Sequence, residues 1–357
     1  LQQDAVGQYE RYPDSKSDLF AVFIERGNAW IKENACNCMV TMQSWMFLSS
    51  FEQLRVKTLN RMTIGTLMHM ENMVLGIAFG TAVTTFRNMH ISGYKGTYNQ
   101  IKLCDIEDGK PKAFPVPGNR FAQVSADNFR KIPGSPVAYW VGERLFEIFQ
   151  TSKKLNDYAP PKQGLITGDN DRFLRLWFEI SIDKMARHSE RLKWIPINKG
   201  GEYRRWYGNQ EYVVNWENDG SEILNLKDDQ GKLRSRPQNL GFNFKKSISW
   251  SLVTSGGFAV RFYPENFMFN VAGIACFPNE NINYILALLN TKLASGITQI
   301  LNPTINMNAG DVSKLPVLID KHQYDHIDGT AQSLIEMAKR DWDSFETSWD
   351  FKKHPMI

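Results

Sequence analysis

Cysteine and histidine are the residue types that most often hold a metal, and their spacing here does not build a metal site. Cys36 and Cys38 are one residue apart, but no second Cys or His pair follows at zinc spacing. His322 and His326 stand four apart without the general-base glutamate of the zinc-protease pattern. The sequence therefore predicts no metal site and no disulfide framework, and structural or solvated roles for its four cysteines (Cys36, Cys38, Cys104, Cys276).

Cations interleaved with aromatic residues are the stronger chemical signal. The stretch from Lys184 to Trp206 holds seven basic residues against two Glu (Lys184, Arg187, Arg191, Lys193, Lys199, Arg204, Arg205). The stretch from Lys232 to Lys246 holds five basic residues and no acid (Lys232, Arg234, Arg236, Lys245, Lys246). Basic clusters beside aromatic side chains are typical of surfaces that bind a polyanion with stackable bases. The alternative is a solvated face whose rings turn inward.

The first ninety residues alternate helix and strand patterns. Asp18 is a plausible N-cap for a helix that ends near Asn34, and a second helix is expected over residues 47–60. The apolar run 38–42 predicts a strand buried on both faces of a parallel sheet, and residues 63–70 and 78–86 predict two further strands. This order indicates the closing half of an open α/β sheet. No G-x-G-x-x-G loop for a nucleotide occurs in the chain.

The remaining chain changes character twice. We expect a strand over residues 96–105, a proline-rich loop over 109–118 and a helix over 137–150. Tyr158-Ala159-Pro160-Pro161 is a boundary signal, after which short strands separated by glycine and asparagine turns continue to residue 318. Helices are expected over residues 279–301 and 328–345.

Length and composition describe a folded protein of more than one domain. The chain has 357 residues, of which 42% are hydrophobic and 22% charged, and a net charge of +4. This composition excludes disorder as a description of the whole chain. No apolar run approaches the 18 or so residues of a membrane helix, and neither an initiator Met nor a signal peptide is present. The sequence predicts a soluble, intracellular protein and leaves open that it is a segment of a longer one.

Three stretches carry a specific resemblance when they are considered together. The first covers residues 12–26 and 39–55. The second is Gln163-Gly164-Leu165-Ile166-Thr167-Gly168-Asp169-Asn170-Asp171-Arg172-Phe173, followed by residues 193–196 and 199–208. The third is Asn302-Pro303-Thr304-Ile305-Asn306, followed by residues 312–317. In order and spacing they resemble the PglX family, the adenine-N6 DNA methyltransferases of BREX phage-defence systems, and more distantly the methyltransferase part of type II restriction-modification enzymes.

The resemblance implies an α/β fold in two parts. The C-terminal half of a Rossmann-like class I methyltransferase sheet is expected over residues 1–90, followed by a connector over 91–161. A mixed α+β target-recognition domain is expected over 162–320, and a C-terminal helix and tail over 321–357. The family implies S-adenosylmethionine as cofactor, double-stranded DNA as partner, further defence-system subunits and a cytoplasmic location, with no membrane.

The chain departs from the family in lacking its reactive loops. Neither the S-adenosylmethionine loop nor the [DNS]-P-P-[YFW] catalytic loop is present, and the nearest string, Ala159-Pro160-Pro161-Lys162, lacks the polar residue and the aromatic. That loop polarises the exocyclic amine and stacks on the extruded base. We therefore expect no catalytic residue in this chain and no methyl transfer by the chain alone. It is expected to be the C-terminal portion of a longer enzyme.

Two aromatic residues are candidates for the wall of a base pocket. A flipped base needs stacking surfaces on both faces, and ligands in open α/β sheets lie at the C-terminal ends of strands. Phe79, flanked by Gly76 and Gly80, is the first candidate, and the alternative for it is a core position in its strand. Trp45, which follows the strand ending at Met42, is the second.

DNA-facing loops are predicted in the recognition half. Lys199-Gly200-Gly201 followed by Arg204-Arg205-Trp206 has the character of a phosphate-binding turn, with a solvated hairpin as the alternative. The planar donors of Arg234, Arg236 and Gln238 suit guanine and adenine edges. The expected DNA-binding residues are Thr167, Gly168, Asn170, Arg172, Lys199, Gly200, Gly201, Arg204, Arg205, Trp206, Arg234, Arg236, Gln238, Asn302, Thr304 and Asn306. For the turn at 167–172 the alternative is an Asx-type turn that starts a helix.

The resulting functional hypothesis is one part of a site-specific DNA adenine-N6 methyltransferase that modifies one adenine in a non-palindromic site. In this hypothesis the chain contributes a wall of the base pocket and the recognition of DNA sequence, and the missing N-terminal methyltransferase half is its partner. The alternative is a stand-alone, catalytically inactive DNA-binding module in phage defence.

Overall fold

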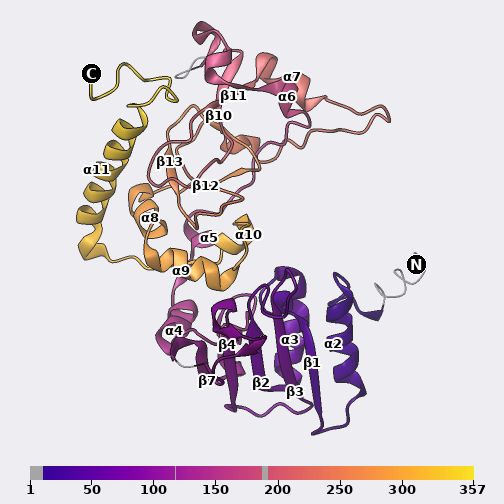
Figure 1. Cartoon of the computed structure of the whole chain (residues 1–357). Helices are drawn as coiled ribbons and strands as arrows, with labels where there is room; N and C mark the ends of the chain where they lie inside the picture. The colour runs from indigo at the N-terminus through magenta and orange to yellow at the C-terminus, as the bar shows by residue number, and fades with distance from the viewer. Residues whose placement is uncertain (1–10, 117, 187–191) are drawn as a thin grey trace. The chain divides into compact units, whose positions relative to one another are not determined.

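The computed structural model describes residues 11–116, 118–186 and 192–357, which divide into two compact units at Ser152–Lys153 (Figure 1). Arg187 and Arg191 of the first basic stretch lie outside the described residues. No described helix is both long and apolar enough to cross a membrane. Each unit has its own sheets and core.

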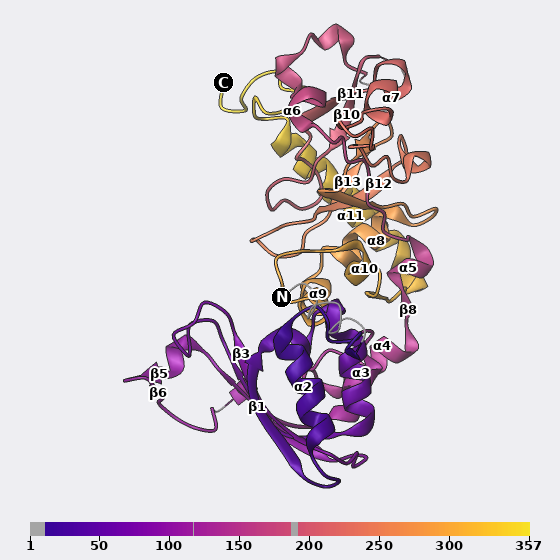
Figure 2. The same cartoon turned by 90° about the vertical axis from the view of Figure 1, so that its right-hand side faces the viewer.

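The first unit is built on a mixed five-stranded sheet with the order β1-β3-β2-β4-β7. Its strands are β1 (Cys36–Met42), β2 (Thr63–Met70), β3 (Thr81–Arg87), β4 (Lys95–Ile101) and β7 (Phe121–Ser125). β3 pairs antiparallel with both β1 and β2, while β4 runs parallel to β2 and antiparallel to β7. A short ribbon of β5 (Ile106–Glu107) and β6 (Lys110–Pro111) projects from it (Figure 2).

Two expectations for this sheet need correction. The run 38–42 was expected to be buried on both faces of a parallel sheet, but β1 is an antiparallel strand at the edge of the described sheet, and Val40 is 61% exposed. An apolar run alone does not distinguish a buried strand from an edge strand. The region 91–161 was expected to be a connector, but β4 and β7 belong to the same sheet.

Helices on one face of the sheet form the core of the first unit. α2 (Leu19–Trp30) and α3 (Glu52–Arg61) lie side by side over the strands (Figure 2), and α4 (Glu143–Thr151) ends the unit. The core joins Ile24 of α2 and Leu54 of α3 to Leu67, Phe86 and other inward residues of the strands. Asp18 is the predicted N-cap of α2, and its side chain accepts a hydrogen bond from the Phe20 N–H.

Helix ends differ from their predicted positions where local turns intervene. The helix expected over 47–60 begins at Glu52, because short 3₁₀ turns over Gln43–Met46 and Ser49–Phe51 precede it. α2 ends at Trp30 rather than near Asn34, and the helix expected over 137–150 begins only at Glu143. Apolar periodicity marks these helices but does not fix their ends.

Arg55 of α3 ties the loops around this core together. Its guanidinium is 1% exposed and donates to the carbonyls of Trp45 (2.9 Å), Leu48 (2.6 Å) and Gly134 (2.7 and 3.0 Å). Burial lowers the pKa of Arg55 to about 10, and the charge of Glu52 opposes that shift. One buried cation thus donates to the Trp45 and Gly134 carbonyls and shares the Leu48 carbonyl with the Phe51 N–H.

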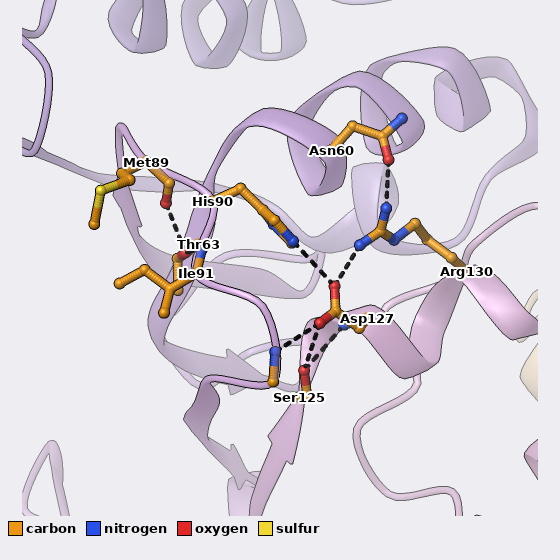
Figure 3. A network of polar contacts seen from close by, with 9 residues as sticks. Asn60, Thr63, Met89, His90, Ile91, Ser125, Asp127 and Arg130 are labelled. Carbon is orange, nitrogen blue, oxygen red and sulfur yellow. Dashed lines mark hydrogen bonds and ion pairs between the residues drawn. The ribbon is translucent and has the colours of Figure 1, made fainter.

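A second polar network closes the edge where β2 and β4 begin (Figure 3). The Asp127 carboxylate accepts the Gly93 N–H at 2.8 Å and pairs with Arg130 and, at 3.4 Å, with His90. Arg130 also donates to the Asn60 side chain at 2.6 Å. Burial alone would raise the pKa of Asp127, but the Gly93 N–H and Arg130 outweigh it and hold that pKa below its usual value.

The second unit contains two further sheets. β14 (Met268–Phe269), β10 (Trp194–Asn198), β11 (Tyr212–Asn215) and β9 (Leu174–Leu176) form one, in that order. β13 (Arg261–Tyr263), β12 (Ser247–Ser251) and β15 (Gly273–Cys276) form the other. The short strands β8 (Lys153–Lys154) and β16 (Pro316–Val317) pair separately. Short strands with glycine and asparagine turns are what the sequence predicted here.

Helices of the second unit are α5 (Leu155–Tyr158), α6 (Asn170–Phe173), α7 (Glu217–Leu224), α8 (Ile282–Leu289), α9 (Lys292–Leu301), α10 (Ala309–Val312) and α11 (Tyr324–Trp342). The single helix expected over 279–301 is two helices. The Asn290 side chain donates to the Val260 carbonyl and accepts its N–H, and Thr291 caps α9. α11, which runs beside α8 (Figure 1), spans 324–342 rather than 328–345.

Replacing Arg55 by Met should destabilise the first unit strongly. The Trp45 and Gly134 carbonyls would lose their donor, at about 1–3 kcal/mol for each unsatisfied group, while the Leu48 carbonyl would keep the Phe51 N–H. We therefore expect a loss of about 2 kcal/mol or more in the free energy of unfolding. Urea unfolding followed by near-ultraviolet circular dichroism measures it. Arg61→Met, at an exposed position of the same helix, is the matched control and should change stability by less than about 0.5 kcal/mol. Equal effects of the two substitutions would contradict the assigned role.

Candidate functional site

Three strands of the first sheet end at the same edge. β1 and β2 are both antiparallel to β3 and therefore run parallel to each other, and β4 runs with β2. All three end at the same edge, where β3 begins. In sheets of parallel strands this is the edge at which ligands bind. The segment between β2 and β3, residues 71–80, lies there and carries the first candidate.

Phe79 is exposed on this segment. It precedes β3, which begins at Thr81, and its side chain is 45% exposed, so it is not a core residue of a strand. The same segment exposes further large apolar side chains (Met73, Leu75, Ile77). A turn with left-handed backbone at Met73 and Gly76 shapes it, and the Met73 N–H donates to the Ile77 carbonyl at 2.8 Å.

Trp45 lies inside the core and offers no free ring face in the described structure. It is 1% exposed, and its ring centroid is 5.6 Å from that of Phe86. Its carbonyl accepts from Arg55. A base could not stack on Trp45 in this arrangement, so of the two pocket candidates only Phe79 has the exposure that stacking requires.

A buried histidine lies near the end of β2, at the same edge of the sheet as the Phe79 segment, and the sequence had not indicated it. His69, near the end of β2, is 8% exposed, and its Nε2 faces the Gln43 side chain while its Nδ1 lies 3.2 Å from the Tyr139 hydroxyl. Burial lowers the pKa of His69 to about 4, against a smaller opposing effect of Glu71. The imidazole is therefore neutral at physiological pH. Nothing in the local sequence distinguishes it from other histidines, because Gln43 and Tyr139 are far from it along the chain.

In the second unit the structure brings two predicted stretches together. Ile166 and Arg236 exchange backbone hydrogen bonds of 3.0 and 2.9 Å. Gly168, with φ +79°, packs so tightly on Arg234 that an added Cβ would lie 2.8 Å from the Arg234 carbonyl carbon. The turn at 167–172 and the basic segment 234–238 thus form one surface, although some 65 residues separate them in the chain.

Within that surface the turn itself is largely self-contained. Asp169 caps α6 by accepting the Arg172 N–H at 3.1 Å, and the Thr167 hydroxyl donates to Asn170 at 2.7 Å. The Arg172 guanidinium pairs with Glu222. These contacts match the alternative of an Asx-type turn that starts a helix, and they leave Arg172 with its charge already compensated.

Arg234 and Arg236 differ from Arg172 in their ion pairing. Both are exposed, and neither forms an ion pair with an acid in the part of the chain that the structure describes. Gln238 is half-buried beside them. Lys162 and Lys245 lie over the ring of Phe242, with Nζ 5.5 and 5.2 Å from its centroid. Of these, Lys162 was missed because it stands alone at a proline-rich boundary.

The turn at 199–206 is used for packing. Gly200 is buried with φ +80°, and an added Cβ would lie 2.5 Å from the Ala272 carbonyl oxygen; Gly201, with φ +108°, packs against Asn209. Lys199 and Arg205 lie over the rings of Tyr212 and Tyr203. The two glycines therefore allow close approach of other chain segments, which explains their presence without a phosphate.

Arg204, Trp206 and the loop around Asn302 also form contacts within the second unit. Arg204 lies over Trp342 and pairs with Asp341 at 3.4 Å. Trp206 exchanges backbone hydrogen bonds with Val260 and Phe262. The buried Asn302 holds its own loop, because its amide donates to the Asn306 carbonyl and to Asp311 while its oxygen accepts the Thr304 N–H and hydroxyl.

Comparisons with known proteins find DNA-modification enzymes that are similar to this chain. Residues 2–74 match the Eco57I restriction-modification methylase family. The chain is 38% identical over 99% of its length to the adenine-specific methyltransferase PglX of Lacticaseibacillus casei (strain Zhang), and 38% identical over 98% to the adenine-specific methyltransferase BrxX of Escherichia coli O9:H4 (strain HS). It spans 30% and 28% of the lengths of these relatives.

A solved structure shares the fold. The Type IIL restriction-modification enzyme MmeI, determined in complex with DNA, matches all of this chain and 50% of its own length, with a TM-score of 0.59 and 12% identity. At that identity the likeness concerns the fold alone. The mixed α/β architecture predicted from the sequence is confirmed at this level, as is the resemblance to PglX-type methyltransferases.

Lowering the pH from 7 to 5 should destabilise the first unit through His69. The unfolded state binds more protons than the folded state between the folded pKa of about 4 and the unfolded value of 6.5, so stability is present above pH 6.5 and is lost as pH falls. We expect a loss of about 2 kcal/mol over this range. Urea titration followed by hydrogen exchange of peptides from β2 and β3 measures it.

The control for this pH dependence separates His69 from other groups. His69→Gln should remove most of the slope, whereas His90→Gln, at the opposite edge of the sheet, should keep it. The Asp127 carboxyl, whose pKa is lowered, affects stability only at more acidic pH. An unchanged slope in His69→Gln would contradict the burial of a neutral imidazole.

Proposed function

Because this chain is homologous over nearly its whole length to the adenine-specific methyltransferases PglX and BrxX, we propose that it forms part of a site-specific DNA adenine-N6 methyltransferase of a phage-defence or restriction-modification system. The first unit completes the methyltransferase sheet and supplies one wall of the base pocket. The second unit binds double-stranded DNA and contributes to recognition of its sequence. The chain corresponds to less than a third of each relative, so the reaction belongs to a larger protein.

The observation that carries this proposal is the exposed ring of Phe79 at the edge where β1, β2 and β4 end. An enzyme that modifies a base inside a duplex extrudes it and stacks it against aromatic or apolar side chains. Phe79 has the exposure and the position for such a contact. The apolar side chains of Met73, Leu75 and Ile77 on the same segment extend this surface.

The free side of β1 supports a sheet that continues beyond the described strands. Val40 is exposed, and α2 carries a second apolar stripe of Leu19, Phe23 and Trp30 that faces away from the core. An uncovered strand edge with apolar neighbours favours pairing with another strand. We propose that the remaining methyltransferase half pairs here and brings the N-P-P-Y and cofactor loops to the Phe79 edge.

S-adenosylmethionine would supply the methyl group that the adenine N6 receives. This chain has no glycine-rich loop after a strand that could cradle the cofactor, so its residues do not form that site and we assign them no step through it. Its own contribution is to stack the base and to bind DNA.

DNA recognition is assigned to the surface formed by the turn 167–172 and the segment 234–238. Arg234 and Arg236 are the exposed, uncompensated cations in it, and arginine reads guanine edges and phosphates through its planar donors. Gly168 and Ile166 hold the segment in place through backbone contacts. The turn at 199–206 and the Asn302 loop are engaged in packing and in hydrogen bonds of their own, so we assign them no part of this surface.

Methylation of DNA in cells separates this proposal from the alternative of an inactive DNA-binding module. The complete enzyme should produce N6-methyladenine at one non-palindromic site, detected by sequencing of native DNA, whereas this chain alone should bind DNA without methylating it. Binding by both proteins with no methylation by either would favour the module. Methylation on both strands of a symmetric site would contradict the expected non-palindromic recognition.

Phe79→Ala in the complete enzyme should lower kcat by about 10- to 100-fold, because stacking on an aromatic ring is worth about 1–3 kcal/mol per base. DNA affinity should change little. Phe345→Ala, which removes a similarly exposed phenylalanine of the second unit, is the matched control and should retain most activity. Single-turnover methylation of one defined duplex measures the rate. Equal losses in the two variants would remove Phe79 from the pocket.

Arg234→Gln combined with Arg236→Gln should weaken DNA binding and its salt dependence. Each phosphate contact that is lost reduces the slope of log K against log salt by about 0.9, and a lost base contact costs about 1–3 kcal/mol of discrimination. Arg172→Gln, whose guanidinium already pairs with Glu222, should bind as the unmodified chain does. Fluorescence anisotropy across a salt series with a randomised duplex and a target duplex measures both effects. Weakening by Arg172→Gln alone would reverse the assignment.

A further inference from the structure

A chain of side chains connects the core of the first unit to the segment that carries Phe79. It runs from Tyr139 through His69 and Gln43 to Gly80, the residue directly after Phe79. Each link is a hydrogen bond or a close packing contact. The residues come from three separate parts of the chain, so their meeting is a property of the fold and not of a local motif.

Gln43 contacts Gly80 through both its backbone and its side chain. The Gln43 N–H donates to the Gly80 carbonyl at 3.0 Å, which extends the pairing of β1 with β3 by one step beyond the strand ends. The Gln43 side chain lies directly against the Gly80 Cα, so that an added Cβ would be 2.3 Å from Gln43 Nε2. A side chain at position 80 would displace the Gln43 side chain from this contact, and the backbone hydrogen bond joins Gln43 to the residue next to Phe79.

His69 holds Gln43 in that position. The side chains of His69 and Gln43 are hydrogen-bonded through Nε2 and Oε1. With the amide oxygen as acceptor, Nε2 carries the proton and Nδ1 accepts from the Tyr139 hydroxyl at 3.2 Å. Both ring nitrogens of a neutral imidazole are thereby satisfied. A neutral histidine is the form that fits, and the burial of this side chain favours it.

Aromatic rings enclose the histidine. Trp140 stacks on His69 with ring centroids 6.4 Å apart and an interplanar angle of 27°. Tyr139 meets Trp140 edge to face at 4.9 Å and stacks on the buried Tyr98 at 5.2 Å. Trp140 is 44% exposed, so it covers His69 on one face and meets solvent on the other. These rings shield the imidazole of His69 from solvent.

We propose that His69 is a positioning residue which, through Gln43, holds Gly80 and so directs the Phe79 ring toward the extruded base. The inference rests on the proposed function and deepens it by naming what orients the stacking residue. An apolar side chain at position 69 would fill the same space without fixing Gln43. A fully satisfied buried polar network, in contrast, specifies one arrangement of its members.

The test places a fluorine reporter on Phe79 itself. 4-Fluorophenylalanine is incorporated at position 79 of this chain, and the ¹⁹F spectrum is recorded without DNA. His69→Leu, Gln43→Leu and Gly80→Ala should each shift the resonance toward that of free fluorophenylalanine and narrow it. His69→Gln, which can still donate an amide N–H to Gln43, should retain most of the original shift.

Controls separate positioning from general loss of structure. A second reporter at Phe121, exposed on β7, should be unaffected by every one of these substitutions, and near-ultraviolet circular dichroism should confirm a folded core. His90→Gln, at the opposite edge of the sheet, should leave both reporters unchanged. A Phe79 resonance that stays the same in folded His69→Leu and Gln43→Leu proteins would overturn the proposal.

A second measurement links orientation to the base. In the complete enzyme, 2-aminopurine at the target position should lose its extrusion-dependent fluorescence change in His69→Leu by at least half, with DNA affinity retained, and regain most of it in His69→Gln. Because the fluorine test needs neither DNA nor cofactor, the two failures are distinguishable. Lack of any extrusion signal in the unmodified enzyme would count against the proposed function, whereas an unmoved Phe79 reporter would count against His69.

Discussion

The pairing of β3 with both β1 and β2 is the constraint on which the candidate pocket depends. Since β3 runs against two strands that are parallel to each other, the ends of β1 and β2 and the start of β3 must meet at one edge. The bond from the Gln43 N–H to the Gly80 carbonyl continues this register past the strand ends. Phe79 is therefore held next to a rigid ladder, although it lies on an exposed segment.

The polar networks at the two edges of the sheet differ in charge. At the edge where β2 and β4 begin, Asp127, Arg130 and His90 form a charged, partly solvated network that ties loops together (Figure 3). At the edge beside Phe79 the side chains of His69, Gln43 and Tyr139 form a neutral network, and Trp140 stacks on the imidazole. Such a network keeps its geometry over the physiological pH range.

The sequence predicted the helices and strands of the first unit well because apolar periodicity is a local property. It did not predict that β1 is an edge strand or that 91–161 joins the same sheet, since pairing partners lie far apart in the chain. Phe79 could be proposed from its glycine neighbours and the family resemblance, and its exposure agrees with that proposal. His69 could not be proposed from the sequence, because its contacts are with Gln43, 26 residues earlier, and with Tyr139, 70 residues later.

In the second unit, charge compensation decides which predicted cations remain available. Arg172, Arg204 and Arg234 look alike in sequence, yet Arg172 pairs with Glu222 and Arg204 with Asp341, while Arg234 is exposed beside Gly168. These ion pairs are solvent-exposed and each is worth little, but the neighbouring carboxylate repels an approaching phosphate and so lowers the net attraction. Basic clusters in a sequence thus indicate an anion-binding surface only in outline, because the acids that pair with them are not visible in the pattern.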